Sequence, residues 1–322
     1  MNSDDLNSLC ASSFAGQNLS GRSFAGKTLS QCDFSDCDLT GCDFTRSRIT
    51  NTRFPQARLS DALFDEALLT DVDFSAAQLT QASFVRTVLT KVQFEGSTLE
   101  RALFQATSFT DVLFTGTSLP QATLMHLGGL PDLVRCDLTQ THFLHCDLTC
   151  LRLCHVHAPM LILQKCKGQH LHVSESDLTQ CQAMFGDYSQ SSFQDTILMR
   201  AAFIGSDLTQ TSFTGSDLSQ SHFIASKVAL ANFGKVSLTK ANFTQANCRG
   251  ADFTEARLNM ADFSHAELHD VLFDNADLTS ANFHAADISQ ASVTGASLTG
   301  LRSTDPLLLQ AETFRIPTDP QG

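Results

Sequence analysis

A five-residue period in residues 191–300 constrains the fold more than any other feature of this chain. Phenylalanine returns every ten residues there, and a leucine or another apolar residue stands halfway between most successive phenylalanines. A small residue usually stands two positions before each large one, as Ala241 does before Phe243. The repeating unit therefore reads small, polar, large, polar, polar. A period this short and regular has to be explained before any other feature.

A single regular element cannot explain this period. An α-helix turns by about 100° per residue, so a five-residue step would spread the large side chains around its whole surface. A flat strand alternates its two faces, and because five is odd, successive large residues would point to opposite sides. The direction of the chain must therefore be reset once per unit. We expect a corner after every five residues and a coil that buries phenylalanine and leucine on its axis.

The period extends over nearly the whole chain but is interrupted once. It runs from Leu9 to Leu124 and again from Leu133 to Leu298, and Leu124 and Leu133 are nine residues apart where ten would keep the phase. We divide the chain into an N-terminal cap (1–8), a first repeat block (9–124), a loop or kink with a register shift (125–132), a second block (133–302) that is irregular at 150–190, and a C-terminal tail or cap (303–322). The interruption is either a one-residue deletion or a projecting recognition loop.

Individual units carry a recognisable motif. Examples are Ala251-Asp252-Phe253-Thr254-Glu255, Ala261-Asp262-Phe263-Ser264-His265 and Ala276-Asp277-Leu278-Thr279-Ser280. They resemble the motif A-(D/N)-L-x-x of the pentapeptide-repeat family, in which the central residue is Leu or Phe. The resemblance implies an all-β fold, a right-handed four-sided parallel β-helix with one unit per side and about fourteen coils. The expected axial core includes Phe34, Phe54, Phe74, Phe203, Phe223, Phe243, Phe263, Leu208, Leu218 and Leu238.

A coil of 20 residues makes a specific statement about charges. It places Asp33, Arg53 and Asp73 in one outward column, and it places Asp38 next to Arg58. We therefore expect ladders of alternating sign on the outer walls. Exposed ion pairs contribute only about 0–1 kcal/mol each, so these ladders test the register more than the stability.

The composition limits what the chain can bind and where it resides. A net charge of −13 disfavours direct contact with nucleic acid or anionic lipid. No apolar run is long enough to cross a membrane, and the first residues lack the pattern of a secretory signal. Cys32, Cys37 and Cys42 occupy the small slot of successive units, so we expect buried reduced thiols and a cytoplasmic protein. Export by a specialised secretion system is left open.

Cysteine and histidine gather between residues 126 and 181, and Cys150-x3-Cys154-His155-x-His157 offers the atom types that zinc prefers. Two features favour ordinary packing instead. The histidines fall in columns on different walls, and several cysteines lie in the small buried slot, namely Cys136, Cys146, Cys166 and Cys181. We therefore expect no metal and no other cofactor, although the segment leaves a structural metal open.

Catalytic motifs are not found in the sequence. It contains no Gly-rich phosphate loop, no HExxH and no GxSxG. The aspartates stand just before the central residue, which places them on flat outer walls without the enclosure that shifts a pKa toward catalysis. We expect a protein that is not an enzyme.

The resulting functional hypothesis is a rigid interaction module that binds another protein. Apolar residues at the interruption and in the tail are the candidate contacts: Met125, His126, Leu127, Leu130, Leu307, Leu308, Leu309 and Phe314. The resemblance adds bacterial effectors and components of secretion machinery as roles of this kind. A homodimer formed through the C-terminal tail is a further option for the partner.

Two other functions stay open. Some proteins of the family mimic DNA, bind type II topoisomerases and confer quinolone resistance. Duplex DNA carries about one charge per 1.7 Å, so a rod of about 70 Å would need on the order of 40 negative charges. The net charge of −13 is well below this value. The third function is a passive structural spacer.

Overall fold

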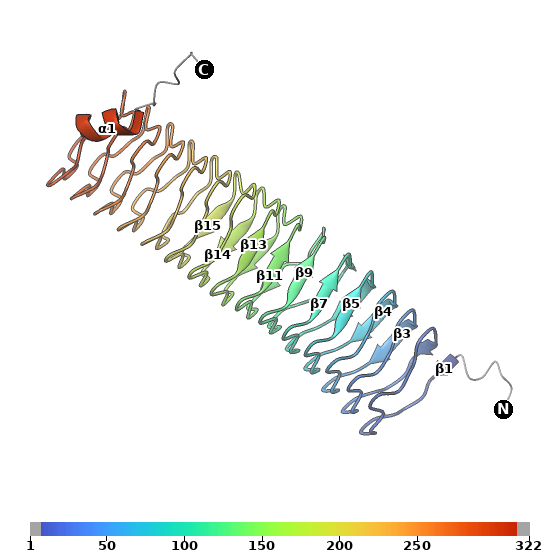
Figure 1. The fold of residues 1–322 in the computed structure, drawn as a ribbon. Coiled ribbons are helices and arrows are strands. Elements are labelled where there is room, and N and C mark those ends of the chain that lie inside the picture. The colour runs from blue at the N-terminus through green and yellow to red at the C-terminus, as the bar shows by residue number, and fades with distance from the viewer. Residues whose placement is uncertain (1–7, 314–322) are drawn as a thin grey trace, which may run out of the picture.

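The computed structural model describes residues 8–313 and shows a parallel β-solenoid that forms a long rod (Figure 1). Neighbouring coils pair in parallel at a spacing of 20 residues, so Leu29 lies beside Ile49 and Phe143 beside Leu163. One column of bridges connects Asn18 to Ser297 in fourteen steps without a gap. The expected β-solenoid and its coil length are therefore confirmed. The proposed cap at 1–8 lies, apart from Ser8, outside the described residues.

The described residues form short strands on three walls and one helix. Sheet order is β1-β2-β3-β4-β6-β8 on one wall, β13-β11-β9-β7-β5 on a second and β10-β12-β14-β15 on a third. Isolated parallel bridges continue these walls where no strand is formed. The bounds are β1 (Ser8–Cys10), β2 (Thr28–Ser30), β3 (Arg48–Arg53), β4 (Leu68–Asp73), β5 (Ser83–Val85), β6 (Val88–Gln93), β7 (Leu103–Gln105), β8 (Ser108–Thr110), β9 (Thr123–Met125), β10 (Leu133–Val134), β11 (His142–Leu144), β12 (Arg152–Cys154), β13 (Ile162–Gln164), β14 (His172–Ser174), β15 (Ser192–Gln194) and α1 (Pro306–Thr313).

The corner of each unit is a residue in the left-handed backbone region. It stands two positions after the central residue, as Gln31 does with a φ of 56° and Gln56 with a φ of 58°. This is the once-per-unit reset that the period requires. Left-handed φ is unfavourable for residues other than glycine by about 1–2 kcal/mol, so each such corner has a cost that the buried contacts must offset.

Aspartate at the outward position before the centre stabilises the turn that leads to the corner. Asp277 illustrates this, because its Oδ1 accepts hydrogen bonds from the backbone N–H of Thr279 at 3.0 Å and from its hydroxyl at 2.6 Å. The hydroxyl bond keeps the pKa of the Asp277 carboxyl below its usual range. The Asp/Asn and Ser/Thr of the repeat motif thus form a local side-chain turn.

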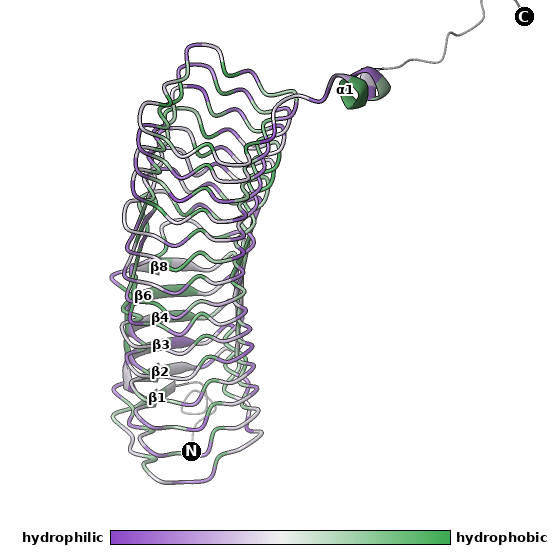
Figure 2. Ribbon diagram, turned by 90° about the vertical axis from the view of Figure 1, so that its left-hand side faces the viewer, coloured by the Kyte–Doolittle hydropathy of each residue, from purple (hydrophilic) through white to green (hydrophobic). Residues whose placement is uncertain are grey.

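Stacked phenyl rings fill the axis. Phe203 and Phe223 lie one coil apart with ring centroids 5.3 Å apart and planes 12° apart, while Phe213 meets Phe203 edge-on at 71°. Both geometries are favourable for aromatic pairs, by about 0.5–1.5 kcal/mol beyond burial. Apolar and polar residues alternate along each coil (Figure 2). All ten residues expected on the axis are fully buried.

The stretch at 150–190, which is irregular in sequence, keeps its register in the structure. Asp147, Lys167, Asp187 and Asp207 continue one column of bridges. Tyr188 fills the axis there, and its hydroxyl donates to the Leu163 carbonyl at 3.0 Å. The ring fits because Gly168 and Gly186 flank it.

Glycine is required at both flanking positions. A Cβ at residue 168 would lie 2.6 Å from the ring of Tyr188, and one at residue 186 would lie 2.5 Å from it. The absence of side chains at Gly168 and Gly186 therefore leaves the space that the ring of Tyr188 fills, and the coil needs no bulge.

The interruption at residues 125–132 is a one-residue deletion, and these residues do not project as a loop. Thr123 pairs with His142 and Ser118 with Asp137, so this coil has 19 residues. Leu127 takes a buried small slot and Leu130 packs partly against the core. The recognition-loop interpretation is wrong, because the chain absorbs the missing residue while these apolar side chains turn inward.

The charge ladders have the predicted register. Arg53 lies between Asp33 and Asp73 in adjacent coils, and Arg58 Nη1 lies 3.6 Å from Asp38 Oδ2. No helix among residues 8–313 has the length and apolar character needed to cross a membrane.

Replacing Ala106 by glycine should raise the free energy of unfolding by about 0.5–1 kcal/mol, because Ala106 is an exposed corner with a φ of 51°. The matched change Ala102→Gly, in a buried small slot, should lower it by about 1–2 kcal/mol. Urea unfolding followed by circular dichroism measures both. If both variants changed the free energy of unfolding in the same direction, the assignment of Ala106 as a left-handed corner would be wrong.

Phe233→Ala should lower the free energy of unfolding by about 3–5 kcal/mol, because the ring is fully buried between the rings of Phe213 and Phe253. The control Lys240→Gln, at an exposed corner, should change it by less than about 0.5 kcal/mol. The same denaturation experiment measures both variants. Equal midpoints for the two variants would show that the stack is not what holds the coils together.

Candidate interaction surface at the C-terminal end

The last coil exposes central side chains whose counterparts one coil earlier are buried. Ile288, Val293 and Leu298 are central residues, and they are 53%, 42% and 43% exposed. The equivalent Leu268, Phe273 and Leu278, one coil earlier, are fully buried. The difference arises because no further coil stacks on the last one.

The helix α1 follows this coil and adds more apolar surface. Asp305 caps it, since its Oδ1 accepts from the N–H groups of Leu307 at 2.9 Å and Leu308 at 3.2 Å, and Pro306 occupies the first helical position. Leu307 is 78% exposed and Leu308 is 47% exposed. In Figure 2 the helix stands to the side of the rod. We expected a tail or cap at 303–322 and did not predict this helix, although Asp305-Pro306 is a start signal for one.

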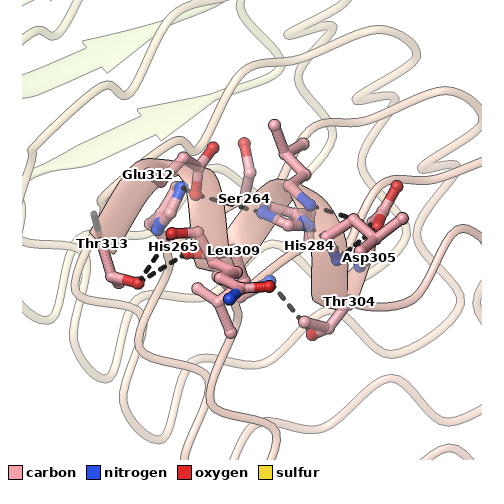
Figure 3. A network of polar contacts seen from close by, with 12 residues as sticks. Ser264, His265, His284, Thr304, Asp305, Leu309, Glu312 and Thr313 are labelled. Atoms are coloured by element: carbon pink, nitrogen blue, oxygen red, sulfur yellow. Dashed lines mark hydrogen bonds and ion pairs between the residues drawn. The ribbon is translucent and has the colours of Figure 1, made fainter.

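A polar network connects α1 to the last two coils (Figure 3). Glu312 Oε2 lies 3.3 Å from His265 Nε2 and 3.2 Å from His284 Nε2. The backbone N–H of Asp305 donates to His284 Nδ1 at 3.1 Å, and the N–H of Ala285 donates to the Thr304 hydroxyl at 3.1 Å. Because Nδ1 of His284 accepts a hydrogen bond, its Nε2 carries the proton in the neutral ring and donates to Glu312.

The hollow beside this network has a volume of about 320 Å³, near the lower end of the range of about 300–1,000 Å³ that small-molecule pockets span. Arg302 and Asp305 line it together with the two imidazoles and Glu312. The Asp305 carboxylate is already used by the helix cap. The network therefore positions α1 and offers two imidazole nitrogens and one carboxylate oxygen to the hollow.

The sequence-predicted contacts do not form one surface. Met125 is half-buried, His126 is exposed and stacks on His145 with ring centroids 5.3 Å apart, and the buried Leu127 is not accessible. Leu130 and Leu309 are half-buried, and Phe314 lies outside the described residues. Leu307 and Leu308 are the members of the set that expose large apolar surface.

The Cys- and His-rich segment does not bring three ligands together among the residues that the structure covers. His155 pairs with Glu175 at 3.5 Å and His157 with Asp177 at 3.4 Å, in separate columns. Burial raises the pKa of the Cys136 thiol to about 11, which makes it inert as a nucleophile. Cys32, Cys37 and Cys42 are buried free thiols.

The group whose ligand atoms do converge is His265, His284 and Glu312, within 4.8 Å of one another. Sequence reasoning missed it. The spacing of 265 and 284 places the two histidines on neighbouring coils, which was a usable signal. Glu312 could not be placed without knowing that residues 306–313 are helical.

Comparisons with known proteins agree with the fold. A profile described as "Pentapeptide repeat region" matches residues 226–302, and one described as "Pentapeptide repeats (8 copies)" matches residues 12–51, 28–65, 67–105 and 189–225. These ranges together span more than half of the chain. No curated protein matches the chain.

Several solved structures are similar to the chain. HetL, a pentapeptide repeat protein involved in heterocyst differentiation regulation from the cyanobacterium Nostoc sp. strain PCC 7120, is 19% identical, with 84% of this chain and 88% of that chain covered and a TM-score of 0.25. A trypsin-treated form of QnrB1, a plasmid-mediated fluoroquinolone resistance protein, is 12% identical, with coverages of 96% and 99% and a TM-score of 0.27.

A pentapeptide repeat protein from the thylakoid lumen of Arabidopsis thaliana is 26% identical, with 38% of this chain and 78% of that chain covered and a TM-score of 0.15. At TM-scores this low, the likenesses say nothing about activity or partner. The family rests on the matched profiles and on the five-residue units themselves. This chain belongs to the pentapeptide-repeat family.

Proposed function

We propose that this chain is a rigid, non-enzymatic rod that binds another protein through its C-terminal end. The observation that carries the proposal is the end patch, which we define as Ile288, Val293, Leu298, Leu307 and Leu308, each 42–78% exposed. Exposed apolar residues that gather in one place are typical of protein contact sites, whereas single ones are common on any surface. The patch comprises three central residues of the last coil and two residues of the helix that follows it.

The rest of the rod supports a scaffold more than a catalyst. Its repeated aspartates hold turns, as Asp277 does, and are thereby committed to the backbone. Two of its wall histidines, His155 and His157, pair with carboxylates in the next coil. The proposal keeps the chain in the cytoplasm, where its thiols stay reduced.

Charge weighs against the DNA-mimic alternative. Lys227 interrupts the acidic column between Asp207 and Glu267, and its Nζ lies 3.4 Å from Asp207. Glu66 contacts both Arg46 and Arg86 on another face. Acids that alternate with bases do not reproduce the continuous charge of a duplex. A gyrase supercoiling assay tests this alternative directly.

The double variant Leu307→Asp/Leu308→Asp should lose at least about 90% of the protein captured from native cells by the full chain, because it places charge on two of the five residues of the end patch. The control Leu230→Asp alters a corner residue that is also exposed, at 58%, but lies on a wall, and should capture normally. Affinity purification with quantitative mass spectrometry measures the captured protein. Light scattering shows whether a captured partner is a second copy.

A second variant guards against loss of α1. Val293→Asp lies on the coil and leaves the helix unchanged, and it should reduce capture in the same way. Unchanged thermal unfolding shows that each variant is folded. Equal capture by the wild type and both end variants would refute the end patch as the contact.

A further inference from the structure

The strongest unexplained arrangement is the convergence of His265, His284 and Glu312 between the last two coils and α1 (Figure 3). We propose that these three residues bind a zinc-like divalent cation that locks α1 against the rod. Nothing in the function proposed above requires this site. The inference rests on donor type, donor spacing and burial.

The donor set selects the class of ion. Two imidazole nitrogens and one carboxylate oxygen are a ligand set that zinc uses, with a water in the fourth position. Calcium and magnesium prefer oxygen ligands throughout, so they fit this set poorly. The side chains of His265 and Glu312 are 35% and 36% exposed, which gives an ion an entry path from solvent.

The spacing of the donors agrees with a tetrahedral site. Zinc–nitrogen and zinc–oxygen bonds of about 2.0–2.2 Å place neighbouring ligand atoms about 3.4 Å apart. The observed separations are 3.3 Å from His265 Nε2 to Glu312 Oε2 and 3.2 Å from His284 Nε2 to the same oxygen. All three ligand atoms lie within 4.8 Å of one another. Small side-chain rotations therefore suffice to close the site.

Cation binding at His284 requires a change in the tautomer of its ring. Its Nδ1 accepts the N–H of Asp305 at 3.1 Å, so the proton sits on Nε2 without an ion. A cation on Nε2 requires the neutral ring to carry its proton on Nδ1, which ends the contact from Asp305. The ion and this hydrogen bond exclude each other. Cation binding therefore replaces the hydrogen bonds that His284 makes to α1 and its cap with coordination bonds to the ion.

The charges around the site are mixed. Glu312 supplies the negative charge at the ligand atoms, and Asp305 contributes a second carboxylate that is engaged at the start of α1. Arg302 also lines the hollow and opposes a cation. We therefore expect a site of moderate affinity, which fills or empties with the supply of the ion.

The cation would act on the end patch through α1. The ligand Glu312 is near the C-terminal end of the helix, while Leu307 and Leu308 are in its first turn. Fixing Glu312 to two coils limits how the helix can pivot about residues 303–305. The ion would thereby set the orientation in which α1 presents its leucines.

The test uses the full-length chain with any affinity tag removed, stripped with a chelator and then titrated with zinc against a zinc-binding dye. We expect one ion per chain, and tetrahedral absorption bands when cobalt replaces zinc. Glu312→Gln and His265→Gln should each weaken zinc binding by more than about 100-fold. Loss of a direct ligand should cost more affinity than loss of a residue that only hydrogen-bonds to a ligand. The matched control His222→Gln changes an exposed histidine elsewhere and should bind normally.

Nitrogen NMR of the imidazoles gives a readout that a hydrogen-bonded latch alone would not show. The His284 proton should move from Nε2 to Nδ1 on addition of zinc, and deuterium exchange in residues 306–313 should slow and recover with chelator. One-to-one binding that survives in Glu312→Gln, or a wild type that binds no zinc at micromolar concentration, would overturn the proposal. No partner protein is needed, so this result and the capture result can fail independently.

Discussion

The structure depends on the contact between one coil and the next. Each unit places a large residue on the axis, and 20 residues later the same position stacks on it, as Phe203 and Phe223 do. Backbone hydrogen bonds between the same two coils satisfy the polar groups around that stack, such as the N–H of Phe203 with the carbonyl of His222 at 2.8 Å. Stability in such a rod is a sum over nearest neighbours. A left-handed corner is tolerated at nearly every fifth residue because both kinds of contact depend on it.

The same dependence explains how irregular units are accommodated. In the middle of the rod, the single tyrosine of the chain, Tyr188, occupies the space left by Gly168 and Gly186. At the deletion, Leu127 enters a buried small slot and the ladder resumes at the next coil. In both places the register between coils is kept and the side chains adapt. Register is shared by every column at once, whereas a single side chain affects only its neighbours.

The C-terminal end of the rod lacks this contact between one coil and the next. The last coil has apolar central residues as the other coils do, but no coil lies above it, so Ile288, Val293 and Leu298 meet solvent. The chain then forms α1, which His265, His284 and Glu312 hold beside the coils without covering them. Apolar side chains are therefore exposed both on the axis of the last coil and on the helix that follows it. A partner that covered them would continue the packing that the interior already uses.

The sequence by itself determined the coil and its axial residues, because a five-residue period repeated over most of the chain requires a corner in every unit. The four sides, and with them the coil length of 20 residues, followed from the resemblance of the units to the pentapeptide-repeat motif. The sequence also determined the register of the charge ladders, since Asp33, Arg53 and Asp73 follow from the coil length alone. The tertiary structure decided which irregularities project and which are absorbed, as for residues 125–132. It also decided the meeting of His265 and His284 with Glu312, because that meeting depends on a short helix outside the repeat. Periodic positions are set by local repetition, whereas the path of the chain after the last coil is set by contacts that no period encodes.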